Sequence, residues 1–350
     1  AYEAETTAGF LTLRRGVGAG HEHFERARGI APERAEAVIG LALVASRAGG
    51  GPAAALATLD ERARSVPDTD AGRALSRMRV WLLGMLQRQN EAAALAATLP
   101  PPRSPLELWA AALVLTMDPT PANLAEARSL LSLAVRTSPQ ASLLLHTQWT
   151  RTVVASNATE PERREAAESL LRQWPDQPVA LHLAGVALMT FDPERASALL
   201  REALQRGETD PLCLVNLGIA EARSGDVPAA VATLRRAFDG RLEDAERVQV
   251  LNLISQLQAN EIADELAEHW LERDAASPDA WRFAARAAFR RDVTELALQR
   301  LDQSLALRPG DVDTRLDRVL ILRRTGDRVR ERTELEALAA SHPQHERIHR

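Results

Sequence analysis

The sequence of 350 residues contains no lysine, so each of its 43 basic residues is an arginine. Chemistry that needs a lysine amine is therefore excluded, including Schiff-base formation and the phosphate contact of a P-loop. Arginine at every basic position is typical of a GC-rich bacterial genome. The 48 acidic residues give a formal net charge of −5, so the chain has no overall basic character that would suit nucleic acid.

Cysteine, aromatic residues and long apolar runs are also scarce. Cys213 is the single cysteine, which excludes an intrachain disulfide and a thiolate metal cluster. Its neighbours are Leu212 and Leu214, and we expect it to be a small buried apolar residue. Aromatic residues make up 4% of the chain, which disfavours strands. No apolar run approaches the roughly 18–20 residues that a membrane-spanning helix needs.

Motifs for catalysis and metal binding are likewise missing. The sequence contains no GxGxxG, P-loop, GxSxG or HExxH pattern. His21 and His23 are two residues apart and would point in different directions from a helix. Three further histidines, His342, His345 and His349, would share a helical face only if Pro343 did not interrupt it. We therefore expect no enzyme activity, no catalytic residues, no cofactor and no metal site.

What the sequence does contain is a pattern that repeats between Pro278 and Pro343. Six positions recur 34 residues later: Trp281, Ala285, Ala297, Leu301, Ser304 and Pro309 correspond to Arg315, Val319, Glu331, Leu335, Leu338 and Pro343. A period of this length is typical of a solenoid of helix pairs, in which each pair buries its apolar face against its neighbours only.

A proline motif extends this register along the whole chain. An apolar residue is followed after three positions by a usually small residue, and after five more by proline. It occurs as Phe24/Ala27/Pro32, Leu59/Arg62/Pro67, Leu131/Ala134/Pro139, Leu301/Ser304/Pro309 and Leu335/Leu338/Pro343. The first two positions lie on one helix face, and proline ends the helix.

The first helix of each pair has a mark of its own, an apolar residue followed by a small one. Examples are Ile39-Gly40, Leu83-Gly84, Ala184-Gly185, Leu217-Gly218 and Ala284-Ala285. Glycine inside a helix costs roughly 1 kcal/mol relative to alanine. Its recurrence therefore predicts that the two helices of a pair cross at short distance there.

These residues resemble the tetratricopeptide repeat family. The clearest unit, Pro211–Leu242, contains the family's Asn-Leu-Gly in its first helix, Gly225-Asp226 in the turn and Ala230 early in its second helix. The resemblance implies an all-α, right-handed superhelical solenoid of about ten antiparallel helix pairs. We expect units at about 1–32, 33–67, 68–102, 103–139, 140–177, 178–210, 211–243, 244–277, 278–311 and 312–345.

We expect these units to form one domain over 1–345, followed by a polar tail, 346–350. The proline cluster Pro100-Pro101-Pro102 and an inserted loop at 118–121 predict a bend near 98–122.

In the resembled family the first helices line the concave face and contact the ligand. Carried over to this chain, one part of that face is apolar, with Val179, His182, Val186, Met189, Val215 and Ile219. These residues suit either an apolar partner segment or additional core.

A second part of the face is polar. Arg282, Arg286 and Arg290 project from one helical side, near Asn252 of the preceding unit. Clustered arginines suggest either a partner with an anionic group or neutralisation by Asp279 or neighbouring glutamates.

The leading functional hypothesis is a non-enzymatic scaffold that binds a protein or an extended peptide on the concave face. One alternative is an extracytoplasmic assembly or secretion factor, of the polysaccharide-export or pilus type. The start at Ala1 instead of Met motivates it, because export, processing or trimming would each remove an upstream segment. Another is the regulatory repeat region of a larger enzyme. The compartment, the partner's identity and the oligomeric state are left open by the sequence.

Overall fold

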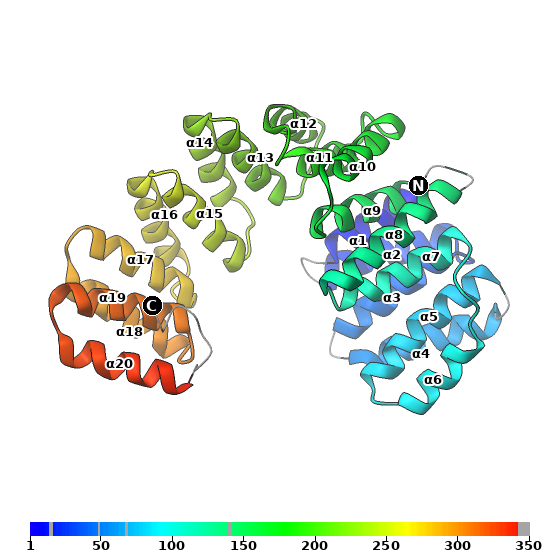
Figure 1. Cartoon of the computed structure of the whole chain (residues 1–350), viewed down its shortest axis with the longest axis horizontal. Coiled ribbons are helices and arrows are strands. Elements are labelled where there is room, and N and C mark those ends of the chain that lie inside the picture. The colour runs from blue at the N-terminus through cyan, green and yellow to red at the C-terminus, as the bar shows by residue number, and fades with distance from the viewer. Residues whose placement is uncertain (14–16, 48–49, 67–68, 139, 141, 342–350) are drawn as a thin grey trace. The chain divides into compact units, whose positions relative to one another are not determined.

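A computed structural model describes the protein at all residues except 14–16, 48–49, 67–68, 139, 141 and 342–350 (Figure 1). Within this described part the chain forms twenty α-helices and no strands. None of these helices is both long enough and apolar enough to cross a membrane. The chain divides into two compact units, Ala1–Glu208 and Thr209–Arg350.

The first unit contains α1 (Tyr2–Thr12), α2 (Val17–Ile30), α3 (Ala35–Arg47), α4 (Gly51–Ser65), α5 (Asp70–Met85), α6 (Gln89–Thr98), α7 (Pro105–Met117), α8 (Pro121–Thr137), α9 (Leu143–Ala155), α10 (Glu160–Gln173), α11 (Pro178–Leu188) and α12 (Pro193–Gln205). The second unit contains α13 (Leu212–Arg223), α14 (Val227–Phe238), α15 (Asp244–Gln256), α16 (Asn260–Arg273), α17 (Pro278–Arg290), α18 (Thr294–Leu307), α19 (Val312–Thr325) and α20 (Arg328–Ser341).

The predicted repeat is confirmed, because each of the ten expected sequence units contains one helix pair. The proline stops are also confirmed where they are described: α2 ends at Ile30 before Pro32, and α18 ends at Leu307 before Pro309. Pro67, Pro139 and Pro343 lie outside the described residues. This architecture is consistent with the tetratricopeptide repeat family. Its right-handed twist, the single domain over 1–345 and the bend near 98–122 stay predictions, and the tail 346–350 is not described.

Helix starts follow from short sequence signals. Ser104 precedes Pro105 and forms a capping box with Glu107, while Thr120 caps α8 and Ser277 caps α17, each directly before a proline. A side-chain oxygen at this position accepts a hydrogen bond from a free helix N–H, and proline needs no acceptor at the first helical position. The connection 99–104 between α6 and α7 contains no helix, as the proline cluster predicts.

The core of the first unit departs from a simple solenoid. One continuous apolar cluster extends from Phe10 of α1 to Ala166 of α10. The ring of Phe10 meets that of Trp109 of α7 edge to face, with 5.3 Å between centroids. Arg151 of α9 donates a hydrogen bond to the carbonyl oxygen of Phe10 over 3.5 Å. Figure 1 shows α1 beside α9.

The expectation that every pair packs against its sequence neighbours only is therefore wrong for the first unit. The physical reason is the reach of large aromatic side chains: Phe10 and Trp109 are both fully or almost fully buried, and each covers the other. The first helices thus pack against helices that lie far ahead in the chain, and the unit closes on itself.

The predicted close approach within a pair is confirmed at Gly218, whereas Gly40 instead meets Phe24 on α2, a helix of the preceding pair. The ring of Phe24, which is completely buried, lies between Gly9 and Gly40. A Cβ at Gly40 would stand 2.3 Å from that ring, and one at Gly218 would stand 2.6 Å from Leu234. The same prediction is wrong for Gly84, where a Cβ would meet nothing within 4 Å.

We predict opposite effects for two alanine substitutions in the first unit. Gly40→Ala forces the Phe24 ring out of its slot and lowers the free energy of unfolding by about 1–3 kcal/mol, the usual cost of overpacking. Gly84→Ala has room and raises it by up to about 1 kcal/mol through helix propensity. Urea unfolding followed by circular dichroism measures both. Equal effects of the two substitutions would contradict this explanation.

Candidate functional site

The three arginines predicted to bind a partner all lie on α17 but face different helices. Arg282 is buried, and it donates to Asp279 over 3.0 Å and lies 3.3 Å from Asp313 of α19. Arg286 donates from two nitrogens to both carboxylate oxygens of Asp317 on α19, over 2.6 and 2.9 Å.

Arg290 turns the other way, toward the preceding repeat. Its Nε atom donates to Asp264 of α16 over 2.8 Å, and a second nitrogen contacts the same oxygen. Every arginine of the predicted patch therefore has a carboxylate partner inside the unit. Of the two interpretations that the sequence left open, neutralisation describes these contacts. Asp279 was expected in that role, while the other partners are aspartates of α16 and α19.

The predicted apolar residues are mostly covered. His182, Met189 and Val215 are buried, whereas Val179, Val186 and Ile219 are partly buried. Val215 belongs to the apolar core of the second unit. The Nδ1 atom of His182 lies 3.7 Å from a carboxylate oxygen of Glu208. These side chains pack within their units, and of the predicted set Asn252 on α15 and Arg290 are the exposed ones.

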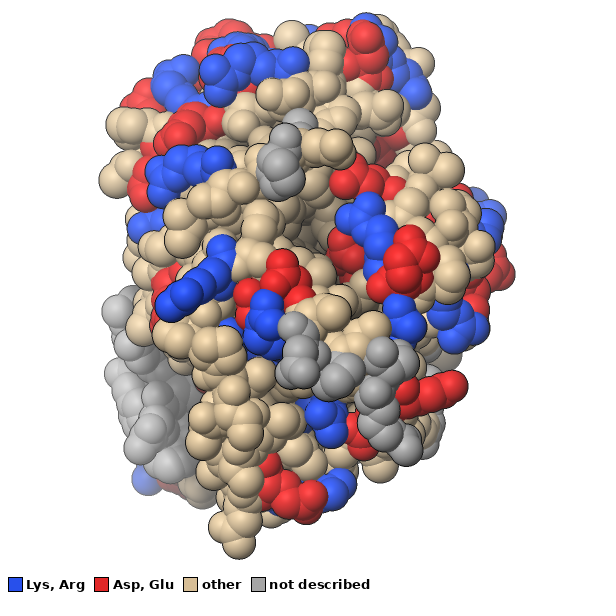
Figure 2. Space-filling model, turned by 90° about the vertical axis from the view of Figure 1, so that its right-hand side faces the viewer, with Lys and Arg blue, Asp and Glu red and all other residues tan. Residues whose placement is uncertain are grey.

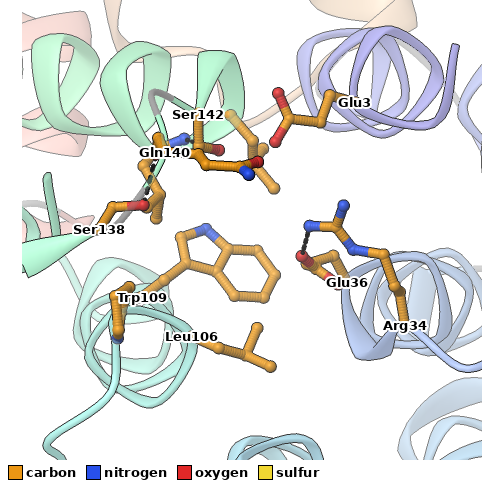
Figure 3. A pocket seen from close by; sticks show the side chains of 11 residues that line it. Glu3, Arg34, Glu36, Leu106, Trp109, Ser138, Gln140 and Ser142 are labelled. Atoms are coloured by element: carbon orange, nitrogen blue, oxygen red, sulfur yellow. Dashed lines mark hydrogen bonds and ion pairs between the residues drawn. The ribbon is translucent and has the colours of Figure 1, made fainter.

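The first unit contains a pocket that the sequence did not reveal. It has a volume of about 220 Å³ and is lined by residues of α1, of α3 and the Arg34 before it, of α7, and of α9 with the residues just before it. Figure 3 shows Trp109 at its centre, with Ser138, Gln140 and Ser142 on one side and Glu3, Arg34 and Glu36 on the other.

One wall of this pocket is a closed set of polar contacts. Arg34 donates to Glu36 over 2.6 Å and lies over the ring of Tyr2, 4.2 Å from its centroid. The hydroxyl of Tyr2 donates to the other oxygen of Glu36 over 3.1 Å. Burial raises the pKa of the Tyr2 phenol far above its ordinary value, and the nearby charge of Glu36 raises it further. Tyr2 therefore stays a neutral hydrogen-bond donor.

Two other polar groups of the pocket have no such partner. The side chain of Trp109 is buried, with 1% of its surface exposed. Its indole N–H makes no hydrogen bond among the described residues. The carboxylate of Glu3 has no ion pair or side-chain hydrogen bond to any residue that the structure describes. Buried polar groups are nearly always paired, so the buried indole N–H of Trp109 is an exception, while Glu3 is only partly buried.

His146, on the adjacent α9, is neutral at physiological pH. Burial lowers the pKa of its imidazole, and the hydrogen bond to the carbonyl oxygen of Ser142 and the charge of Glu3 oppose this only in part. Across the described part of the chain, no group of three or more His, Cys, Asp or Glu side chains is arranged to hold a metal ion. His342, His345 and His349 lie outside that part.

Sequence reasoning missed this pocket because its residues come from four distant segments. Only Trp109 carried a signal, as one of six tryptophans in a chain with few aromatic residues. Nothing in the spacing of Glu3, Trp109 and Gln140 indicates that the first unit brings them together.

Comparisons with known proteins find similarity at a low level only. No protein-family model and no curated protein matches the sequence. Among solved structures, the APC/C hetero-tetramer Cut9–Hcn1 has a TM-score of 0.39 at 10% identity, over 98% of this chain and 87% of that one. YrrB, described as a TPR protein with an unusual peptide-binding site, has a TM-score of 0.37 at 16% identity, over 53% of this chain and 95% of that one.

A third similar structure is the human IFIT1 dimer with PPP-AAAA. Its TM-score is 0.44 at 17% identity, and the match covers 89% of this chain and 73% of that chain. All three identities are below 25% and all three TM-scores are below 0.5. What these proteins bind is therefore not transferred to this chain.

We predict that Arg286 and Asp317 stabilise the second unit as a coupled pair. A double-mutant cycle with Arg286→Ala and Asp317→Ala should give a coupling energy of about 1 kcal/mol, because the contact is bidentate and partly shielded from water. The exposed pair Arg332 and Glu336 on α20 is the matched control. Urea unfolding should show a much smaller coupling there, and equal values for the two pairs would contradict the prediction.

Proposed function

We propose that the chain is a non-enzymatic scaffold that binds a protein or an extended peptide, with the first helices of the second unit as its binding face. The observation that carries this proposal is the way in which successive first helices are tied together. Arg286 joins α17 to α19, and Ser277, the cap of α17, donates to Asp244 of α15 over 2.6 Å. Repeats fixed in this manner present a long, preformed surface to a partner.

The ion pairs of α17 determine which of its arginines can contact a partner. Arg282 is buried, and both oxygens of Asp317 hold Arg286, so an anionic partner would have to displace a fixed carboxylate at either residue. Arg290 is exposed and shares only one oxygen of Asp264. We therefore assign the contact with an anionic group of the partner to Arg290, and a neutral polar contact to Asn252.

Net charge does not favour nucleic acid as the partner. Figure 2 shows arginine and acidic side chains intermixed over the face that it draws, in keeping with the net charge of −5. Binding to the phosphate backbone depends on clustered, uncompensated basic residues. The paired arginines of α17 provide no such cluster.

The test is a substitution that blocks the proposed face without disturbing the fold. Asn252→Arg places a long charged side chain at an exposed position of α15, and we expect partner capture to fall at least tenfold. Tagged protein is used to purify partners from the source organism, and captured proteins are quantified by mass spectrometry relative to the unsubstituted chain.

Gln303→Arg on α18 is the matched control, because it introduces the same side chain at an exposed position of a second helix. Partners that are lost with Asn252→Arg and retained with Gln303→Arg support the proposed face. Retention of every partner by both variants, with unchanged circular dichroism, would refute it.

A further inference from the structure

We propose that the pocket of the first unit binds an α-ammonium group together with the carbonyl oxygen next to it. Free amino acids and the N-terminus of a peptide share this chemistry. The site lies wholly within the first unit, so it is separate from the face proposed for the second unit and stands or falls independently of it.

The positive charge of the ligand is inferred from the charges that line the pocket. Glu3, Arg34 and Glu36 are its charged residues. The ion pair between Arg34 and Glu36 cancels two of these charges, and the cation–π contact with Tyr2 holds Arg34 in that position. Glu3 interacts electrostatically with Arg34 but makes no hydrogen bond to it. One negative charge is therefore left for a cationic ligand, and an ammonium group offers it three donors.

The need for an adjacent acceptor comes from the opposite side of the pocket. The indole N–H of Trp109 can only donate, and it is buried without a partner. Ser142 accepts a hydrogen bond from the backbone N–H of Leu145 over 3.4 Å, which leaves its O–H free to donate. Gln140 offers a side-chain amide with no hydrogen bond to another described residue. The donors of Trp109, Ser142 and Gln140 on this side of the pocket would therefore bind an oxygen atom of the ligand.

The arrangement of the two sides favours one compact group. In Figure 3 the donors Trp109, Gln140 and Ser142 and the acceptor Glu3 border the same space. A simple amine would satisfy Glu3 and leave the indole N–H unpaired, which is costly in a buried site. A carboxylate alone would face the charge of Glu3. An ammonium group with a neighbouring carbonyl oxygen satisfies both sides, and about 220 Å³ suits a ligand smaller than most cofactors.

The experiment follows the indole N–H directly. In a ¹H–¹⁵N spectrum of the full chain, six tryptophans give six indole resonances, and the one missing from Trp109→Phe is that of Trp109. We expect alaninamide, which has the ammonium and the carbonyl, to shift this resonance on titration. N-acetylalaninamide lacks the charge and propylamine lacks the carbonyl, so each should bind at least tenfold more weakly.

Isothermal titration calorimetry with Glu3→Gln provides the second readout. Loss of the Glu3 carboxylate, the unpaired one among the described residues that line the pocket, should weaken alaninamide binding at least tenfold, since a charge-assisted hydrogen bond is removed. Glu61→Gln on α4 is the matched control at an exposed glutamate and should bind like the unsubstituted chain. At least tenfold tighter binding of alanine than of Ala-Ala-amide assigns the site to free amino acids, and the reverse assigns it to peptide N-termini. Equal affinity shows that the site recognises only the ammonium and carbonyl that both share, which supports the proposal.

Three results would overturn the proposal: no shift of the Trp109 resonance with any amine, equal binding of the acetylated and free forms, or unchanged affinity in Glu3→Gln. Should Trp109→Phe unfold the first unit, the resonance is assigned by three-dimensional NMR of the unsubstituted chain. Glu3→Gln then still decides, because Glu3 lies at the partly exposed rim and its loss leaves the core intact.

Discussion

The structure depends on how closely two helices of a pair can approach. An isolated helix pair cannot bury enough apolar surface to be stable, so its faces must meet other helices with few voids. Gly185 and Gly218 hold equivalent places in successive pairs, and each admits a leucine of the second helix, Leu200 or Leu234, against the backbone. Where this contact is made, the register of the pair is fixed. The position of the next pair then follows from the faces that remain uncovered.

Arginine ion pairs add a second level of order between repeats. Arg73 of α5 donates to Glu107 of α7, and Arg300 of α18 donates to Glu268 of α16. The residues of these pairs are 34 and 32 apart, close to the repeat length. Guanidinium groups suit this purpose because they form planar, two-point contacts with carboxylates. Within the described part of this chain without lysine, Arg73, Arg286 and Arg300 thus each join helices of neighbouring repeats.

Regular repeats could be predicted from the sequence, because their determinants are local. Proline stops, small residues at helix crossings and apolar spacing all act within one or two helices, so the ten helix pairs and their limits follow. The sequence predicted a turn at Gly225-Asp226, and the backbone of Gly225 there has a positive φ. The same positive φ occurs at Gln258 and Asp292, where no glycine marks it. The nearby helix ends impose this backbone conformation, and side-chain identity does not report it.

The arginines of α17 show where sequence reasoning stops. Their i, i+4, i+8 spacing predicts a common side of the helix, but Arg286 contacts α19 and Arg290 turns toward α16. Whether these arginines can bind a partner depends on helices about 30 residues away in the chain. Those helices carry Asp264 and Asp317, which pair with Arg290 and Arg286. Spacing within one repeat thus identifies candidates, whereas their charge balance is decided by the neighbouring repeats.

Closure of the first unit has a consequence for binding that a regular repeat would not have. A strictly periodic array offers similar surroundings at each repeat, so its polar groups find similar partners. When Phe10 meets Trp109, the start of α1 is brought against α7 and the segment before α9, which have no periodic relation to it. Glu3 and the indole N–H of Trp109 then face a space that no repeat was shaped to fill. The break in periodicity is therefore what creates a site with its own chemical preference, and Trp109, whose ring makes the aromatic contact, also lines that site.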